Sequence, residues 1–273
     1  MDRVRGKVVV VTGAARGQGA AEAAALAREG AHVVAADLTE PRRPLDGVVH
    51  RRLDVADERS WAELAAWLRE TYGRVDGLVN NAGITWRARL EEVTPADLAR
   101  VHAVNLTGPL LGIQHLLPLM PRGASVVNVG SAAALTAHYP VAYTTSKWAL
   151  RGLSAAASLE LGPRGIRVNT VHPGFIETEM TASASPAFRA ANLAETPLGR
   201  AGTVEDVAPL VVFLVSDESS YITGAEIPRG RRLHRAPRRQ VHLGRAARAG
   251  ALTRERPAGH GRQGVTAGIQ KLG

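Results

Sequence analysis

The sequence predicts an α/β protein with a single doubly wound parallel sheet covered by helices on both faces. Strand-length apolar runs alternate with helical patterns as far as residue 227, and the first run, 7–11, leads through a glycine-rich turn into an Ala-rich segment, 20–29. Of the 273 residues, 45% are hydrophobic, which is enough for one sizeable core. We therefore expect one folded domain, 1–227.

The glycine-rich turn, 12–19, reads Thr-Gly-Ala-Ala-Arg-Gly-Gln-Gly and has the form of a phosphate-binding turn. Its glycines let backbone N–H groups approach a pyrophosphate, and the start of the following helix favours negative charge. A second apolar run, 31–36, ends at Asp37, about twenty residues further on, where a carboxylate that binds a ribose hydroxyl is expected. Taken alone, the glycines also fit an ordinary tight turn.

The composition excludes several classes of site. The chain has no cysteine, so disulfides, thiol nucleophiles and thiolate metal sites are excluded. No metal is expected, because His102, His115, His138 and His172 are not spaced as ligands and are better explained as packed or solvated imidazoles. No long apolar span or N-terminal signal is present, so we expect a cytoplasmic protein without a membrane partner.

The net charge of +9 is concentrated at the end of the chain. Residues 228–273 hold 12 Lys and Arg and one acidic residue, whereas residues 1–227 hold 22 basic and 24 acidic residues. The final segment, rich in Arg, Gly and Ala, is predicted to be a disordered basic tail. No aromatic residue follows Tyr221 to stack on bases, so nucleic acid is not expected as a partner.

The middle of the chain supplies two further features. A strand at 48–53 and a helix at 61–72 precede a strand at 75–79, which ends in the Asn-Asn-Ala-Gly turn 80–83, either a plain turn or a ligand wall. A helix begins after the cap Thr94 and runs towards Met120 with Pro109 inside it. Since proline lacks an N–H, the carbonyl of Asn105 loses its helical donor, leaving a hydrated kink or a place for a water that transfers protons.

The second half continues the alternation. A strand at 125–129 ends near Ser131, and a helix to about residue 161 begins with Tyr143 and Lys147 on one face, where the ammonium favours the ionised phenol unless the two are only a surface pair. A strand at 166–171 is broken by Pro173-Gly174. An irregular candidate lid, 175–197, a helix, 203–216, and the start of a last strand, 222–227, follow.

These motifs together resemble the short-chain dehydrogenase/reductase family over residues 5–227. The glycine turn, the Asn-Asn-Ala-Gly turn, the Tyr-x-x-x-Lys pair and the Pro-Gly break follow each other in the family order. The resemblance implies a Rossmann-type sheet and four catalytic residues. Tyr143 is the implied general acid/base, Ser131 polarises the substrate carbonyl, Lys147 binds the ribose and lowers the tyrosine pKa, and Asn105 holds a water through its carbonyl.

The resemblance also implies a nicotinamide dinucleotide cofactor. Asp37 favours NAD because a carboxylate repels a 2′-phosphate, although Arg16, Arg42 and Arg43 lie close in sequence and keep NADP as the alternative. The implied cofactor-binding residues are Gly13, Arg16, Gly17, Gln18, Gly19, Asp37, Asp54, Val55, Asn81, Ala82, Gly83, Tyr143, Lys147, Pro173, Gly174, Ile176 and Thr178. Gln18 departs from the aliphatic residue usual in the family.

Within the family, segments 161–169, 172–174 and 219–226 look like actinobacterial 3-alpha (or 20-beta)-hydroxysteroid dehydrogenases. The expected activity is hydride transfer between NAD(H) and a secondary alcohol or ketone, on a hydroxysteroid or similar hydrophobic small molecule. The alternatives are an NADPH-dependent 3-oxoacyl carrier-protein reductase and a cofactor-binding protein with impaired turnover. The family implies a homo-oligomer, usually a tetramer.

The segment after Ile227 departs from the family, which continues as Val-Asp-Gly-Gly-aromatic. Codons for Val-Asp-Gly-Gly-Phe-Thr-Ala, read after one inserted C, encode Arg-Gly-Arg-Arg-Leu-His-Arg, the sequence of 229–235. We hypothesise that a one-base insertion or a sequencing error replaced the native end.

Overall fold

The computed structural model describes residues 2–41, 43–182 and 184–230. Within them a seven-stranded sheet has the order β3-β2-β1-β4-β5-β6-β7, and every neighbouring pair is parallel. The predicted α/β class with a doubly wound parallel sheet is confirmed. The strands are β1 Val8–Thr12, β2 His32–Asp37, β3 Val48–Arg52, β4 Gly77–Asn80, β5 Ser125–Val129, β6 Arg167–Pro173 and β7 Glu226–Arg229.

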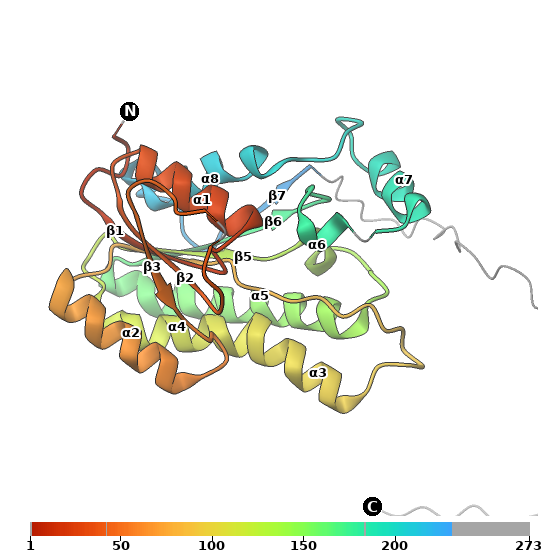
Figure 1. The fold of residues 1–273 in the computed structure, drawn as a ribbon, viewed down its shortest axis with the longest axis horizontal. Coiled ribbons are helices and arrows are strands. Elements are labelled where there is room, and N and C mark those ends of the chain that lie inside the picture. Colours follow the sequence, from red (N-terminus) through yellow and green to blue (C-terminus); the bar gives the residue numbers. More distant parts are fainter. Residues whose placement is uncertain (1, 42, 183, 231–273) are drawn as a thin grey trace, which may run out of the picture. The chain divides into compact units, whose positions relative to one another are not determined.

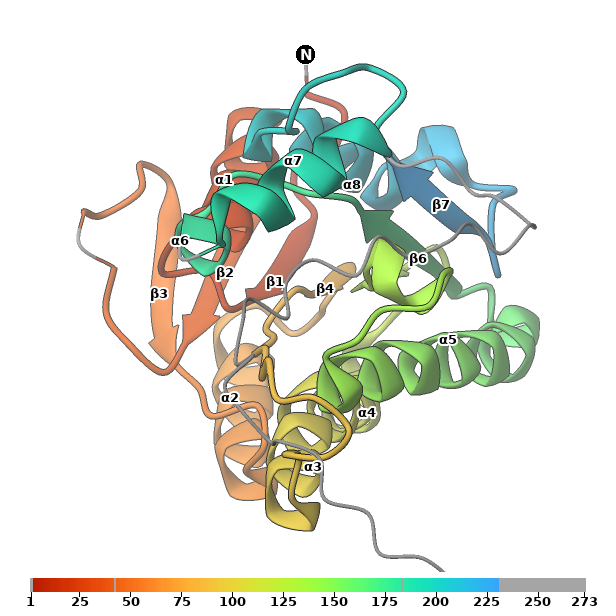
Figure 2. The same cartoon turned by 90° about the vertical axis from the view of Figure 1, so that its right-hand side faces the viewer.

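Helices cover both faces of this sheet (Figures 1 and 2). Helices α1 Gly17–Arg28 and α8 Ala208–Val215 contact each other on one face, and α2 Glu58–Thr71, α4 Gly108–Leu116 and α5 Val141–Leu161 lie on the other. Each face has its own buried apolar cluster. On α2 the four residues that the helical spacing selects, Trp61, Leu64, Ala65 and Leu68, are all buried, as that spacing predicts.

The helix expected from 96 to 120 is present as a continuous helical run from Pro95 to Leu119, with an irregular turn inside it. Helix α3 spans Pro95–His102 behind a Thr94 capping box, a π-helix spans Ala103–Thr107, and α4 follows, with a 3-10 turn at Leu117–Leu119. The π-helix contains Asn105 and ends two residues before Pro109. The irregularity that the proline predicts is therefore a widened turn, which is a common way for a helix to accommodate a lost hydrogen bond.

Three other expected elements need correction. The stretch 175–197 is not irregular throughout, because it contains the short helices α6 Glu179–Ala182 and α7 Pro186–Ala194. The helix expected at 203–216 is a 3-10 turn, Val204–Asp206, followed by α8. The last strand is shifted towards the C-terminus and includes Pro228 and Arg229, which pair with His172 and Pro173. Proline is tolerated there because β7 forms the edge of the sheet.

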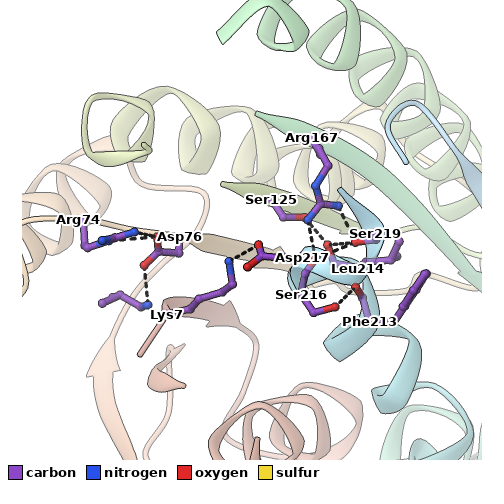
Figure 3. A network of polar contacts seen from close by, with 11 residues as sticks. Lys7, Arg74, Asp76, Ser125, Arg167, Phe213, Leu214, Ser216, Asp217 and Ser219 are labelled. Carbon is purple, nitrogen blue, oxygen red and sulfur yellow. Dashed lines mark hydrogen bonds and ion pairs between the residues drawn. The ribbon is translucent and has the colours of Figure 1, made fainter. Parts of the chain in front are cut away.

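A polar network fastens the sheet at the amino ends of its strands (Figure 3). The buried Asp76 carboxylate accepts from the Val8 amide at 2.9 Å and from Arg74, and the buried Arg167 donates to the Ser219 hydroxyl at 2.8 Å. Burial lowers the pKa of Arg167, while Asp217 raises it. This network occupies the amino ends of the strands. A site formed by loops is therefore expected at the opposite edge, at the carboxyl ends of the strands.

Residues 231–273, which hold most of the predicted basic tail and most of the segment attributed to a changed frame, lie outside the described residues. The described part contains no helix that is long and apolar enough to cross a membrane.

Candidate active site

The carboxyl ends of five parallel strands bring the predicted site residues to one edge of the sheet. Gly13 follows β1, Asp37 ends β2, Asn81 follows β4, Ser131 follows β5 and Pro173 ends β6. Because these strands are adjacent and parallel, segments separated by up to 160 residues meet there.

The glycine turn is packed directly against the Asn-Asn-Ala-Gly turn. Gly13 has φ +65°, and a Cβ on it would lie 2.8 Å from the Ala82 Cα. A Cβ on Gly19 would lie 2.4 Å from both the Asn81 Nδ2 and the Gly13 carbonyl oxygen. Side chains at these positions would collide with backbone, so glycine is required for the two turns to meet.

Asn81 locks this contact with its side-chain amide. Its Nδ2 donates to the Thr12 carbonyl at 2.9 Å and the Gly13 carbonyl at 3.1 Å, while the Thr12 hydroxyl accepts from the amides of Asn81 and Ala82. The amide that the sequence identified as a turn former therefore fixes the backbone whose N–H groups would bind a phosphate.

Asp37 closes the same turn from the neighbouring strand. Its Oδ2 accepts from the Ala15 amide at 3.0 Å, and its Oδ1 accepts from the amide and hydroxyl of Thr39 at 3.0 and 3.2 Å. A cavity of about 230 Å³ lined by 37–40 and 50–52 opens beside it. The carboxylate is thus held at the strand end, next to the glycine turn.

Gln18, the residue that departs from the family pattern, has a partner that the sequence analysis missed. Its Nε2 donates to the Glu22 Oε1 at 2.9 Å and lies 3.5 Å from the Asn81 Oδ1. Glu22 is fully buried in α1, and burial raises its pKa to about 8, against a smaller lowering by Gln18. The signal was available, because an acid four residues after a glutamine lies on the same helical face.

The remaining predicted cofactor residues border the turn or its neighbouring strands. Thr178 packs over Gly17, where a Cβ would lie 3.9 Å from the threonine Cβ, and Arg16 pairs with Glu179 of α6 at 3.2 Å. Ile176 is buried and bridges Gly202. The segment after β6 therefore lies over the glycine turn.

The predicted residues Asp54 and Val55 lie between β3 and α2. The Asp54 Oδ1 accepts from the Ala56 amide, and the Val55 carbonyl accepts from the Trp61 indole.

Asn105 joins the π-helix to α5 and to the loop after Gly83. Its Oδ1 accepts from the Ile84 amide at 2.9 Å, and its Nδ2 donates to the Ile84 carbonyl and to the Ser146 hydroxyl, each at 2.9 Å. Ser146 in turn donates to the Tyr143 carbonyl at 2.8 Å. Sequence reasoning missed Ser146, although it lies between the two residues of the Tyr-x-x-x-Lys motif.

Lys147 is buried on the first turns of α5. Its Nζ donates to the Val129 carbonyl at 2.7 Å, and a Cβ on Gly83 would lie 3.6 Å from that nitrogen and 3.4 Å from the Asn105 Oδ1. Burial lowers the pKa of Lys147 to about 8. Asn105, Lys147 and Gly83 therefore lie together.

Tyr143 shares this end of α5 and meets Ser131. Burial raises the pKa of the Tyr143 phenol, whereas its hydrogen bond with the Ser131 side chain lowers it, and burial dominates. The net shift of the Tyr143 pKa is upward, opposite to the lowering expected from Lys147. The Ser131 hydroxyl oxygen also accepts from the Ala133 amide at 3.1 Å, because Ser131 caps the 3-10 turn Ala132–Ala134.

Aromatic side chains from three segments gather in one cluster. Phe188 of the candidate lid contacts Tyr139, His138 and Phe175, with ring centroids 5.9–6.3 Å apart. His138 and Tyr139 precede α5, and Phe175 follows the Pro-Gly break after β6. A pocket of about 250 Å³ opens beside Phe175, lined also by 228–230.

The family model described as Enoyl-(Acyl carrier protein) reductase matches residues 13–229, which include the glycine turn, the Tyr-x-x-x-Lys pair and β7. The chain belongs to the short-chain dehydrogenase/reductase family. It is therefore an oxidoreductase of that type, and the family binds a nicotinamide dinucleotide.

Several curated relatives are similar over most of this oxidoreductase. Trans-4-hydroxycyclohexanecarboxylate dehydrogenase of Sinomonas cyclohexanicum is 39% identical over 83% of this chain and 92% of its own length. The 3-alpha-(or 20-beta)-hydroxysteroid dehydrogenase of Mycobacterium bovis is 39% identical over 82% and 88%, respectively. The 3-oxoacyl-(acyl-carrier-protein) reductase of Thermotoga maritima is 40% identical over 82% and 96%.

A solved structure shows the same arrangement. The dehydrogenase/reductase from Sinorhizobium meliloti 1021 is 34% identical, with a TM-score of 0.78 over 82% of this chain and 94% of that chain. The residues present fit a dinucleotide, because the turn before α1 has two glycines with positive φ, no acidic residue in the first helical turn and an acid at the next strand end.

Proposed function

We propose that this oxidoreductase uses NAD to interconvert a secondary alcohol and a ketone on a hydrophobic ring substrate such as a hydroxysteroid. The observation that carries the cofactor choice is the position of Asp37 at the end of β2, held by the Ala15 amide of the glycine turn. A carboxylate there accepts hydrogen bonds from a ribose 2′-hydroxyl and repels a 2′-phosphate.

We assign the chemistry to four residues. Tyr143 exchanges a proton with the substrate oxygen. The Ser131 hydroxyl, which is hydrogen-bonded to the tyrosine, donates a hydrogen bond to that same oxygen. The bound nicotinamide would supply or accept the hydride. Lys147 uses one of its three N–H donors on the Val129 carbonyl and keeps the others for a ribose hydroxyl. Asn105 holds the π-helix at the base of α5, where its carbonyl would bind a water.

The substrate class follows from the aromatic cluster. Rings from the segment before α5, from the segment after β6 and from α7 pack together, and flat apolar molecules pack well on such rings. Two relatives, whose names specify a hydroxysteroid and a hydroxycyclohexane ring, support this class. On the family resemblance we also propose a cytoplasmic homotetramer.

A 3-oxoacyl carrier-protein reductase that uses NADPH is the second candidate. The similarity to the Thermotoga maritima enzyme favours it, as does the position of Arg16 in the glycine turn. In the structure the Arg16 guanidinium pairs with Glu179, which competes with a phosphate for that charge.

A side-by-side titration with NADH and NADPH, read as energy transfer from the tryptophans to the nicotinamide, tests the proposal. We expect NADH to bind at least about tenfold more tightly, a difference of about 1.4 kcal/mol. Tighter NADPH binding would favour the carrier-protein reductase, and binding of neither would indicate that the altered segment after Ile227 impairs the site.

Turnover then separates the substrate classes. We expect NADH oxidation with progesterone or 4-oxocyclohexanecarboxylate and little with acetoacetyl carrier protein. The reverse order would overturn the proposed substrate class without changing the cofactor assignment.

A further inference from the structure

His172 lies at the end of β6 and contacts the backbone of Ser131. The imidazole is fully buried, and its Nδ1 lies 3.0 Å from the Ser131 carbonyl oxygen and 3.3 Å from the Ser131 amide nitrogen. A protonated Nδ1 donates to the carbonyl, and an unprotonated Nδ1 accepts from the amide. In either tautomer the ring therefore holds one peptide group of Ser131.

The ring is fitted tightly against the end of β5. A Cβ on Gly130 would lie 2.6 Å from the His172 Nδ1, so only glycine leaves room for this contact. Burial lowers the pKa of His172, partly offset by the Ser131 backbone and Glu226. The ring is neutral near pH 7 and acts through hydrogen bonding and shape.

Two charged residues, Glu226 and Arg151, lie behind the ring. The His172 Nε2 has no hydrogen-bond partner among the described residues and lies 3.8 Å from the Glu226 Oε1 of β7. Glu226 accepts from the Arg151 Nε and Nη2 at 2.5 and 2.6 Å. Arg151 also donates to the Ala134 carbonyl at 2.9 Å. Ala134 ends the 3-10 turn that Ser131 caps, so Arg151 holds the other end of the same segment.

We propose that His172, supported by the Arg151–Glu226 pair, is a positioning residue that fixes the Ser131 hydroxyl relative to Tyr143. This rests on the role proposed above for Ser131. To form a hydrogen bond with a substrate oxygen, a hydroxyl must lie within a few tenths of an ångström of its correct position. A misplacement of about 1 Å costs on the order of 100-fold in rate. The imidazole holds a peptide group of Ser131, and Arg151 holds the Ala134 carbonyl of the same segment. Loss of the imidazole therefore removes one of two supports and loosens the hydroxyl without removing it.

Three variants separate positioning from general packing. His172→Asn places an amide near the position of Nδ1, His172→Gln places one near Nε2, and His172→Ala provides neither. For His172→Ala and His172→Gln we expect kcat to fall about 10- to 100-fold with the dissociation constant for NADH within twofold of wild type. For His172→Asn we expect kcat within about threefold of wild type. His115→Ala, a histidine of α4 that faces Glu58, is the matched control and should leave kcat unchanged.

Hydrogen exchange of the segment 129–136, measured on the apo protein, provides a readout that does not depend on turnover. We expect faster exchange of this segment in the Ala and Gln variants and wild-type protection in the Asn variant. An unchanged kcat in His172→Ala, equal losses in the Asn and Gln variants, or a parallel loss of NADH binding would each overturn the proposal. If the wild type binds NADH but turns over none of the probes, the proposed activity fails, and the exchange pattern alone then decides whether His172 holds Ser131.

Discussion

Glu22 beneath the glycine turn gives this protein a pH-dependent stability that a single substitution should remove. The carboxyl group is fully buried, one oxygen accepts from Gln18 and the other has no hydrogen-bond partner among the described residues. Replacing it in Glu22→Gln keeps the size and an oxygen that can accept from Gln18, but removes the titration.

The magnitude follows from the two states of the chain. Burial raises the pKa of Glu22 in the folded protein to about 8, from an ordinary value of 4.5. Between these two values the folded protein keeps the proton that the unfolded chain has lost. The contribution of the protonated Glu22 to the free energy of unfolding is therefore fully present below pH 4.5 and is lost as the pH rises through 8. This free energy of unfolding falls by about 1.4 kcal/mol per pH unit. Between about pH 5 and 8 the wild type therefore loses about 3.5 kcal/mol of stability, and the variant does not.

Thermal unfolding of both proteins at pH 5, 6, 7 and 8 measures this difference. At about 2–4 °C per kcal/mol, the Tm of wild type relative to Glu22→Gln should fall by roughly 7–14 °C across the series. Glu70→Gln, an exposed acid on α2, is the control and should follow wild type. A constant difference between wild type and Glu22→Gln would refute the argument that Glu22 carries a buried proton.

Three other outcomes are expected. Tyr143→Phe should bind NADH within about threefold of wild type but lose about 100-fold or more in kcat, since the proton donor is gone; substantial remaining turnover would contradict its assignment. Asp37→Ser should reduce the preference for NADH over NADPH by about tenfold in the tryptophan titration, since the carboxylate no longer repels a 2′-phosphate; an unchanged ratio would show that another residue selects the cofactor. Gly112→Ala should lower the free energy of unfolding by about 1–3 kcal/mol in urea titrations, because its Cβ would lie 2.8 Å from the buried Trp61 ring, whereas Gly152→Ala, with no atom within 4 Å of its Cβ, should not destabilise α5.

Much of the site could be predicted because its parts are local. The glycine turn follows from Gly13 and Gly19, whose missing side chains leave space for another turn, and Asp37 follows from the end of an apolar run. Pro109 predicts an irregular turn in its helix, since a missing N–H has a local consequence, and the structure shows that this turn is a π-helix. Parallel strands then bring such strand ends together whatever the packing details are.

The tertiary structure decided what depends on residues distant in sequence. In the sequence Gln18 is only a departure from the family pattern, and its contact with Asn81 exists only in the fold. Glu22 becomes a buried acid only because α1 packs against α8 and the sheet. His172 and Glu226 meet through the register of β6 and β7, which no local pattern specifies. The sequence by itself determined which residues stand at the strand ends, because periodicity and missing side chains act over a few residues. The protonation states of these residues and the partners that hold them depend on the fold, because burial and long-range hydrogen bonds are properties of the packed chain.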